Sequence, residues 1–272
     1  MHMLSWFKRI ASPAPREQLV ETKNQTLPSE EKLERLVGRL GTVTGSANEP
    51  APASTSMRVI VVASQKGGVG KTTIAAHLAV YASMVGQGPA VLVDTDPQSS
   101  LSEWWDARTD EHERDEDALA LATATLDGLP ARLAELGGNG AAVAIIDTPP
   151  AITVSIRRAI EIADFVLIPV RPSPHDLRAV AATVNLTRGA GKPFLFVVNG
   201  ATPRANITAQ AVAALSEHGR VAPVILCQRT DFAASMIDGR TVMETTAAGR
   251  SAQEIAELWK HVCAQTTMRA AA

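Results

Sequence analysis

The chain has 272 residues, 46% of them apolar, which is enough to close a sizeable hydrophobic core. Aromatic residues make up only 4%, and 26 Lys and Arg stand against 28 Asp and Glu, for a formal net charge of -2. This composition excludes an aromatic stacking platform for single-stranded nucleic acid and a globally basic protein, although not a local basic patch. Cys227 and Cys263 are too few for a disulfide framework and lack the spacing of a zinc or redox pair, which favours a reducing cytosol.

Residues 1–56 are polar and punctuated by proline, and we expect a flexible N-terminal extension with one helix at 29–40. In that helix Ser29 can cap the first turn, and apolar side chains follow at helical spacing. Residues 4–10 place three apolar side chains on one helical side, so they could contact a membrane surface or a partner. A frayed terminus is the favoured interpretation. No apolar run reaches the length of a membrane span, so we expect neither a secreted nor an integral membrane protein.

From Met57 onwards short aliphatic runs alternate with helical stretches, which indicates strands buried on both faces. The expected strands are 58–63, 90–94, 118–123, 141–147, 164–170, 193–199 and 223–227. The expected helices include 71–85, 98–108, 153–163, 175–188, 206–218 and 251–263. This alternation predicts an α/β fold, a mostly parallel twisted sheet with helices on both faces. We assign residues 57–265 to this domain and 266–272 to a disordered tail.

The first strand runs into the glycine-rich segment 64–73 (SQKGGVGKTT) and then into a helix, which is the order that a phosphate-binding loop needs. Glycines let successive backbone N–H groups turn toward one anion, and the helix N-terminus adds positive charge. Lys71 can reach the outer phosphates, and the hydroxyl of Thr72 can ligate Mg²⁺. The residues expected to bind nucleotide here are Lys66, Gly67, Gly68, Val69, Gly70, Lys71, Thr72 and Thr73.

The loop departs from the common phosphate-loop pattern, which would require glycine where Gln65 stands, and a second lysine, Lys66, follows. This KGGVGKTT segment resembles the deviant Walker A loop of the ParA/MinD ATPases. The downstream segments VLVDTDPQSSLSEW and AIIDTPP resemble the family's second and third motifs. RPSPHDLRAV is similar to the small plasmid-type ParA proteins in particular. The resemblance covers about Met57 to Val262.

The resemblance implies that Lys66 reaches the nucleotide bound by a second subunit, while Lys71 acts within its own subunit. ATP would then bridge a homodimer, with Mg²⁺ as the metal cofactor. A lysine supplied in this way would couple hydrolysis to dimerisation, because phosphoryl transfer is helped mainly by positioning and by positive charge on the phosphate oxygens.

Asp94 ends one expected buried strand, Asp96 comes directly after it, and Asp147 ends another strand, at the edge where open parallel sheets bind ligands. The resemblance assigns Asp96, a catalytic residue with Lys66 and Lys71, to orienting the attacking water. It places Asp94 and Asp147 with Thr72 around the metal.

Asn199, at the end of a later strand, resembles the residue that reads the adenine edge in related ATPases, and an ordinary turn Asn is almost as good an interpretation.

Arg229, Arg240 and Arg250 follow the last strand, where ParA relatives carry basic residues that bind DNA without sequence preference. The resemblance thus implies a cytoplasmic, nucleoid-associated ATPase that dimerises on ATP and binds DNA, with hydrolysis stimulated by a ParB-like activator. Segregation of plasmid or chromosome DNA is the first hypothesis for its function. ParA-like positioning of a protein cluster and a MinD-like membrane-associated regulator remain alternatives.

Overall fold

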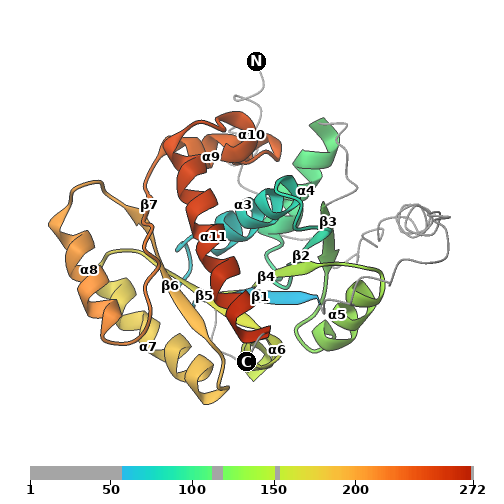
Figure 1. The fold of residues 1–272 in the computed structure, drawn as a ribbon, viewed down its shortest axis with the longest axis horizontal. Helices are drawn as coiled ribbons and strands as arrows, with labels where there is room; N and C mark the ends of the chain where they lie inside the picture. Colours follow the sequence, from blue (N-terminus) through green and yellow to red (C-terminus); the bar gives the residue numbers. More distant parts are fainter. Residues whose placement is uncertain (1–56, 112–118, 151–153, 271–272) are drawn as a thin grey trace, which may run out of the picture. The chain divides into compact units, whose positions relative to one another are not determined.

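The computed structural model describes residues 57–111, 119–150 and 154–270, in which strands and helices alternate (Figure 1). The strands are β1 (Arg58–Val62), β2 (Ala90–Asp94), β3 (Leu119–Thr123), β4 (Val143–Asp147), β5 (Phe165–Val170), β6 (Phe194–Ala201) and β7 (Leu226–Cys227). The helices are α3 (Lys71–Met84), α4 (Ser100–Glu111), α5 (Leu129–Gly138), α6 (Val154–Ile162), α7 (Pro174–Gly189), α8 (Asn206–Ser216), α9 (Thr230–Ser235), the 3-10 helix η2 (Met236–Asp238), α10 (Val242–Thr245) and α11 (Arg250–Ala270).

In the described part of the chain the strands form one sheet in the order β3-β2-β4-β1-β5-β6-β7. Neighbouring strands pair in parallel throughout this order. Every residue of β2, β4 and β5 is buried, as a sheet covered on both faces requires. The predicted α/β fold class is therefore confirmed.

Alternate residues of β1 enter two separate hydrophobic cores, because successive strand side chains point to opposite faces. Ile60 and Val62 pack with residues of α3, α4, α10 and α11. Val59 and Val61 pack with residues of α5, α6, α7 and α8. On the first face α11 lies against α3, the helix that follows the glycine-rich loop (Figure 1).

Three α-helices were not among the elements expected from the sequence. One is α5, where Leu129 and Leu133 are buried at i,i+4 spacing although the helix ends in two glycines. The others are the short helices α9 and α10, which follow β7. Tertiary contacts stabilise such short helices more than their own propensity does.

The last helix is longer than the sequence predicted. α11 continues past Cys263 to Ala270, so residues 266–270, which we had assigned to a disordered tail, are helical. The hydroxyl of Thr266 donates to the carbonyl oxygens of Val262 at 3.1 Å and of Cys263 at 3.0 Å, within the helix. No Gly or Pro interrupts the segment, so no residue breaks the helix there.

The predicted extension 1–56, with its helix at 29–40 and the contact at residues 4–10, lies outside the described residues. Among the helices that the structure does describe, none combines the length and the apolar character needed to cross a bilayer.

Candidate nucleotide-binding site

The predicted site residues come together at the carboxyl ends of three neighbouring strands. Val62, which ends β1, pairs with Asp147 of β4, and Asp147 pairs in turn with Asp94 of β2. The glycine-rich loop leaves β1 at this level and leads into α3. Open parallel sheets bind ligands at this edge.

The backbone of the loop depends on glycine at two positions. Gly68 has φ +72° and Gly70 has φ +93°, both in the left-handed region that side chains other than glycine rarely adopt. Gly70 is also the N-cap of α3 and supplies no side-chain hydrogen bond there. The first turn of α3 thus has no side-chain cap from Gly70, and a helix N-terminus of this kind suits a phosphate.

The two lysines of the loop are placed differently. Lys71 is only 7% exposed, and its Nζ lies 3.4 Å from the carbonyl oxygen of Lys66, to which it donates. Burial lowers the pKa of Lys71, while the carboxylates of Asp147 and Asp96 act in the opposite direction. The side chain of Lys66 is exposed. Lys71 is therefore held within the loop, and Lys66 is open to solvent.

Thr72 and Asp147 form the strongest candidate for a metal site. Thr72 Oγ1 donates to Asp147 Oδ2 at 2.6 Å, and Asp147 is 1% exposed. Asp147 Oδ1 is buried without a hydrogen-bond partner among the described residues. Burial raises the pKa of Asp147 to about 7, although the Thr72 hydrogen bond and the charge of Lys71 lower it. A buried, unpartnered carboxylate oxygen beside a hydroxyl fits a hard cation such as Mg²⁺.

Within the described ranges no three His, Cys, Asp or Glu side chains gather into a metal-binding group. A magnesium ion held here would therefore take most of its ligands from phosphate and water oxygens. This is the usual coordination of Mg²⁺ at phosphate sites, where the protein supplies only one or two carboxylates.

Asp94 is occupied by hydrogen bonds that organise the following segment. Its Oδ1 accepts from the backbone N–H of Asp96 at 3.0 Å. Its Oδ2 accepts from the N–H of Ser102 at 3.0 Å and from the Ser102 hydroxyl at 2.7 Å. Asp94 therefore ties the loop and α4 to the end of β2. Its predicted role as a magnesium ligand stays a prediction.

The sequence analysis did not predict the role of Ser102. The only signal for it was a hydroxyl residue in the first turn of the helix that follows the motif.

Asp96 is half-buried and its Oδ1 accepts from the N–H of Gln98 at 3.0 Å, so the chain turns directly after it. Asp96 lies near enough to Lys71 and Asp147 to affect the pKa of both. Asp96 is thus close to Lys71 and Asp147, and its role in orienting water stays a prediction.

Two threonine hydroxyls join the strand ends, and the sequence analysis predicted neither bond. Thr95 Oγ1 donates to the carbonyl oxygen of Asp147 at 2.6 Å. Thr148 Oγ1 donates to the carbonyl oxygen of Val62 at 2.9 Å. Each follows an aspartate of a motif, so the Asp-Thr pair was the available signal. The two bonds fix β2, β4 and β1 relative to one another at the site.

Asn199 forms a hydrogen bond with the glycine-rich loop, and the sequence analysis did not predict this contact. Its Nδ2 donates to the carbonyl oxygen of Val69 at 2.6 Å. A Cβ atom added at Gly70 would lie 2.2 Å from this nitrogen, so the amide fills the space beside the glycine. Contact of Asn199 with adenine stays a prediction.

The three arginines predicted to contact DNA differ in their surroundings. Arg229 Nη1 is 2.6 Å from Glu254 Oε2, and Arg240 Nη2 is 2.5 Å from Asp238 Oδ2. Arg250 is exposed at the start of α11 and has no ion pair within the described part of the chain. Of the three, Arg250 is the most available to a phosphate.

The fold and the loop define a P-loop nucleotide-binding protein. Residues 60–242 match the CobQ/CobB/MinD/ParA nucleotide binding domain, within the predicted domain 57–265. The chain therefore belongs to the ParA/MinD family of nucleotide-binding ATPases.

Named relatives agree with this assignment. Maintenance of carboxysome distribution protein A from Halothiobacillus neapolitanus is 32% identical over 213 residues, 74% of this chain and 94% of the relative. The chromosome-partitioning ATPase Soj of Thermus thermophilus is 32% identical over 165 residues, 51% of this chain and 66% of Soj. The ATP complex of a McdA variant from Cyanothece has a TM-score of 0.65 at 22% identity, over 76% of this chain and 97% of that one. That structural likeness supports the fold.

Proposed function

We propose that the protein is a Mg²⁺-dependent ATPase that dimerises around ATP, binds DNA without sequence preference and positions a cargo. The hydrogen bond between Thr72 and Asp147 carries this proposal. It places a candidate cation site beside the N-terminus of α3, which has no side-chain cap and suits a phosphate. A partner of the ParB type would stimulate hydrolysis and release the dimer. The protein would then work in the cytoplasm, on the nucleoid.

Each site residue has a definite part in this chemistry. Loop amides and Lys71 hold the phosphates, and Thr72 and Asp147 hold the metal, which neutralises charge on the phosphate oxygens when bound. Asp96 orients the attacking water and accepts its proton. Lys66, exposed on the loop, reaches the nucleotide of the second subunit.

The proposed cargo is DNA, in plasmid or chromosome segregation, which the similarity to Soj supports. A second candidate is a protein cluster. It is favoured by the Halothiobacillus neapolitanus relative, which this chain covers almost completely and whose name refers to carboxysome distribution.

The test is to measure mass in solution, retention of plasmid DNA and co-sedimentation with anionic liposomes, each with ATP, with ADP and without nucleotide. We expect dimers and DNA retention with ATP alone, because one subunit neutralises few phosphates until two act together. Retention should weaken as salt rises, because binding to phosphates releases counterions. Arg250→Glu should weaken DNA retention without changing basal hydrolysis. DNA retention that is equal without nucleotide, or binding to liposomes instead, would overturn the proposal.

A further inference from the structure

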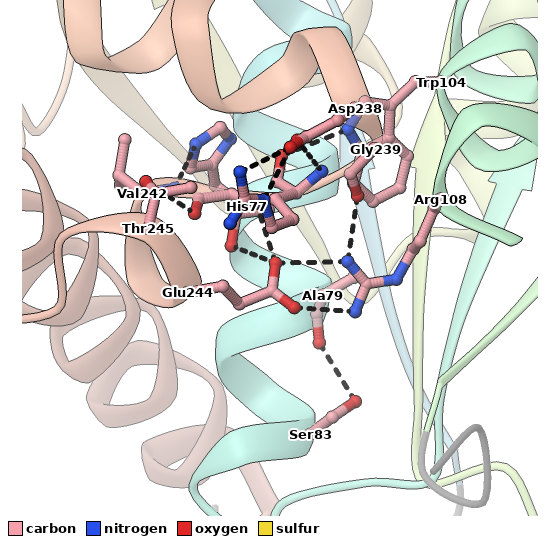
Figure 2. A network of polar contacts seen from close by, with 12 residues as sticks. His77, Ala79, Ser83, Trp104, Arg108, Asp238, Gly239, Val242, Glu244 and Thr245 are labelled. Atoms are coloured by element: carbon pink, nitrogen blue, oxygen red, sulfur yellow. Dashed lines mark hydrogen bonds and ion pairs between the residues drawn. The ribbon is translucent and has the colours of Figure 1, made fainter. Parts of the chain in front are cut away.

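Two polar anchors hold the segment Gly239–Thr245, and the first comes from α3 (Figure 2). His77 is fully buried, and its Nδ1 lies 2.7 Å from the carbonyl oxygen of Thr73. The backbone N–H of Val242 donates to His77 Nε2 at 3.2 Å. Since Nε2 accepts, Nδ1 carries the hydrogen and donates to Thr73. One neutral imidazole thus joins the residue after Thr72 to the first residue of α10.

The second anchor comes from α4, where Trp104 and Arg108 face the same segment one turn apart (Figure 2). Trp104 Nε1 donates to the carbonyl oxygen of Arg240 at 3.3 Å. Arg108 Nη1 donates to the carbonyl oxygen of Gly239 at 2.9 Å. The Arg108 guanidinium also lies 5.5 Å from the centre of the Trp104 ring. Two consecutive carbonyl groups are therefore held by one helix.

The carboxylate of Glu244 joins Arg108 of α4 to the segment itself, because it accepts from both Arg108 and Thr241. Arg108 donates to it twice, from Nη1 at 3.1 Å and from Nη2 at 2.9 Å. The N–H of Thr241 donates to the same group at 2.8 Å and its hydroxyl at 3.0 Å. The side chains of Arg108 and Glu244 are only 11% and 15% exposed. The ion pair is thus largely shielded from water, and removing one partner leaves the other poorly satisfied.

Backbone packing adds a steric constraint at Gly239. This glycine has φ +73°, and a Cβ atom there would lie 2.1 Å from the Cα of Arg108. The segment therefore touches the backbone of α4 and cannot move toward it. The same helix is tied to the site at its other end, because Ser102 donates to Asp94.

We propose that His77, Trp104 and Arg108 are positioning residues. They set the position of the segment Gly239–Thr245 according to whether the nucleotide site is occupied. Each anchor begins beside a residue of the candidate site: Thr73, the acceptor of the His77 bond, follows Thr72 on α3, and Ser102 of α4 donates to Asp94. The segment carries Arg240, whose side chain is 38% exposed and paired with Asp238, so the placement of the segment affects whether that arginine meets DNA. This inference rests on the proposed function for its nucleotide and its DNA.

The test compares amide hydrogen exchange of the full chain, with and without Mg²⁺ and ATP, in the parent, Arg108→Gln and Trp104→Phe. In the parent we expect ATP to change exchange both in the phosphate loop and in Gly239–Thr245. Both variants should keep the response of the loop and lose that of the segment. Trp104→Phe keeps an aromatic side chain, removes the indole N–H and gives up part of the buried ring, so it covers the case in which Arg108→Gln does not fold.

Arg157→Gln is the matched control, because Arg157 pairs with Glu161 on the exposed surface of α6. It should respond to ATP like the parent. DNA retention with ATP should fall about fivefold for each lost hydrogen bond in the α4 variants, and ATP affinity should not change. Arg108→Lys, which keeps a donor, should recover part of the loss.

The outcomes distinguish a failure of this positioning role from a failure of the proposed function on which it rests. If ATP protects the loop of the parent but leaves exchange in Gly239–Thr245 unchanged, the positioning role is wrong and the proposed ATPase stands. The role is also wrong if the variants respond like the parent. If ATP does not protect the loop at all, the proposed function fails, and the inference fails with it.

Discussion

Thr72 on α3 donates its hydroxyl hydrogen to Asp147 at the end of β4, so the first and third motifs meet through one bond of 2.6 Å. The same carboxylate carries Asp147 Oδ1, which has no hydrogen-bond partner among the residues that the structure describes. Two oxygen groups at hydrogen-bonding distance can also share one cation. This relationship makes the magnesium dependence of nucleotide binding the most direct property to measure.

Thr72→Val should lower ATP affinity in the presence of Mg²⁺ by about tenfold, as expected for the loss of one ligand group near the metal. Affinity in EDTA should stay close to that of the parent, because the loop amides and Lys71 remain. Titration with a fluorescent ATP analogue under both conditions measures this. Equal losses with and without Mg²⁺ would show that Thr72 acts through the loop and not through the metal.

Lys66→Ala should still bind ATP but form no ATP-dependent dimer, because the exposed ammonium group is proposed to act on the nucleotide of the other subunit. Lys71→Ala, which removes the buried lysine of the loop, should lose affinity for the nucleotide itself. Size-exclusion chromatography with light scattering distinguishes the two. A Lys66→Ala protein that dimerises with ATP as the parent does would disprove the assignment.

Asp96→Ala should bind ATP and dimerise yet scarcely hydrolyse, because a residue that orients water contributes to the barrier and not to ground-state binding. The dimer should then stay on DNA and ignore an activator. Nucleotide affinity and dimer fraction are measured on the same sample. A joint fall in both would mean that Asp96 mainly supports the metal.

Gly70→Ala should destabilise the nucleotide-free protein more than Gly68→Ala does. Both substitutions force a left-handed backbone at a cost of about 1 kcal/mol, but only the Cβ at position 70 meets another atom, Asn199 Nδ2. Urea denaturation measures the free energy of unfolding. Adding Asn199→Ala to Gly70→Ala should restore part of the difference, and no recovery would mean that the clash is not the cause.

His77 should make stability depend on pH between about 4 and 6.5. Burial lowers its pKa from 6.5 to about 4 in the folded protein, so the unfolded chain takes up the proton first as pH falls. Stability is then lost as pH decreases through this window, by roughly 3 kcal/mol in total. Above pH 6.5 the contribution does not change.

Denaturation of the parent and of His77→Phe across pH 4–7 gives a difference curve that isolates this histidine from the other titrating groups. Its slope should vanish above pH 6.5. His218→Gln, at an exposed position, is the matched control. A flat difference curve would show that the imidazole is not held neutral in the folded state.

The order of the strands and the glycine-rich loop followed from the sequence alone, whereas α5, α9 and α10 did not. Aliphatic runs such as 58–63 and 90–94 predict buried strands because their apolar character is local, and the strands lie where expected. Glycines and lysines in 64–73 predict the loop because its chemistry is built from consecutive residues. Both signals can be read in a short window of sequence.

The side-chain partners of the site residues were decided by the tertiary structure. Ser102 binds Asp94, and Asn199 binds the loop carbonyl of Val69 across 130 positions. Arg108 meets Glu244, 136 positions away. Such pairs depend on how helices cross the sheet, and no periodicity in a single sequence encodes that geometry. The residues of a motif are consecutive, so the sequence shows them directly. The side chains that orient them come from distant parts of the chain and are brought together only by folding.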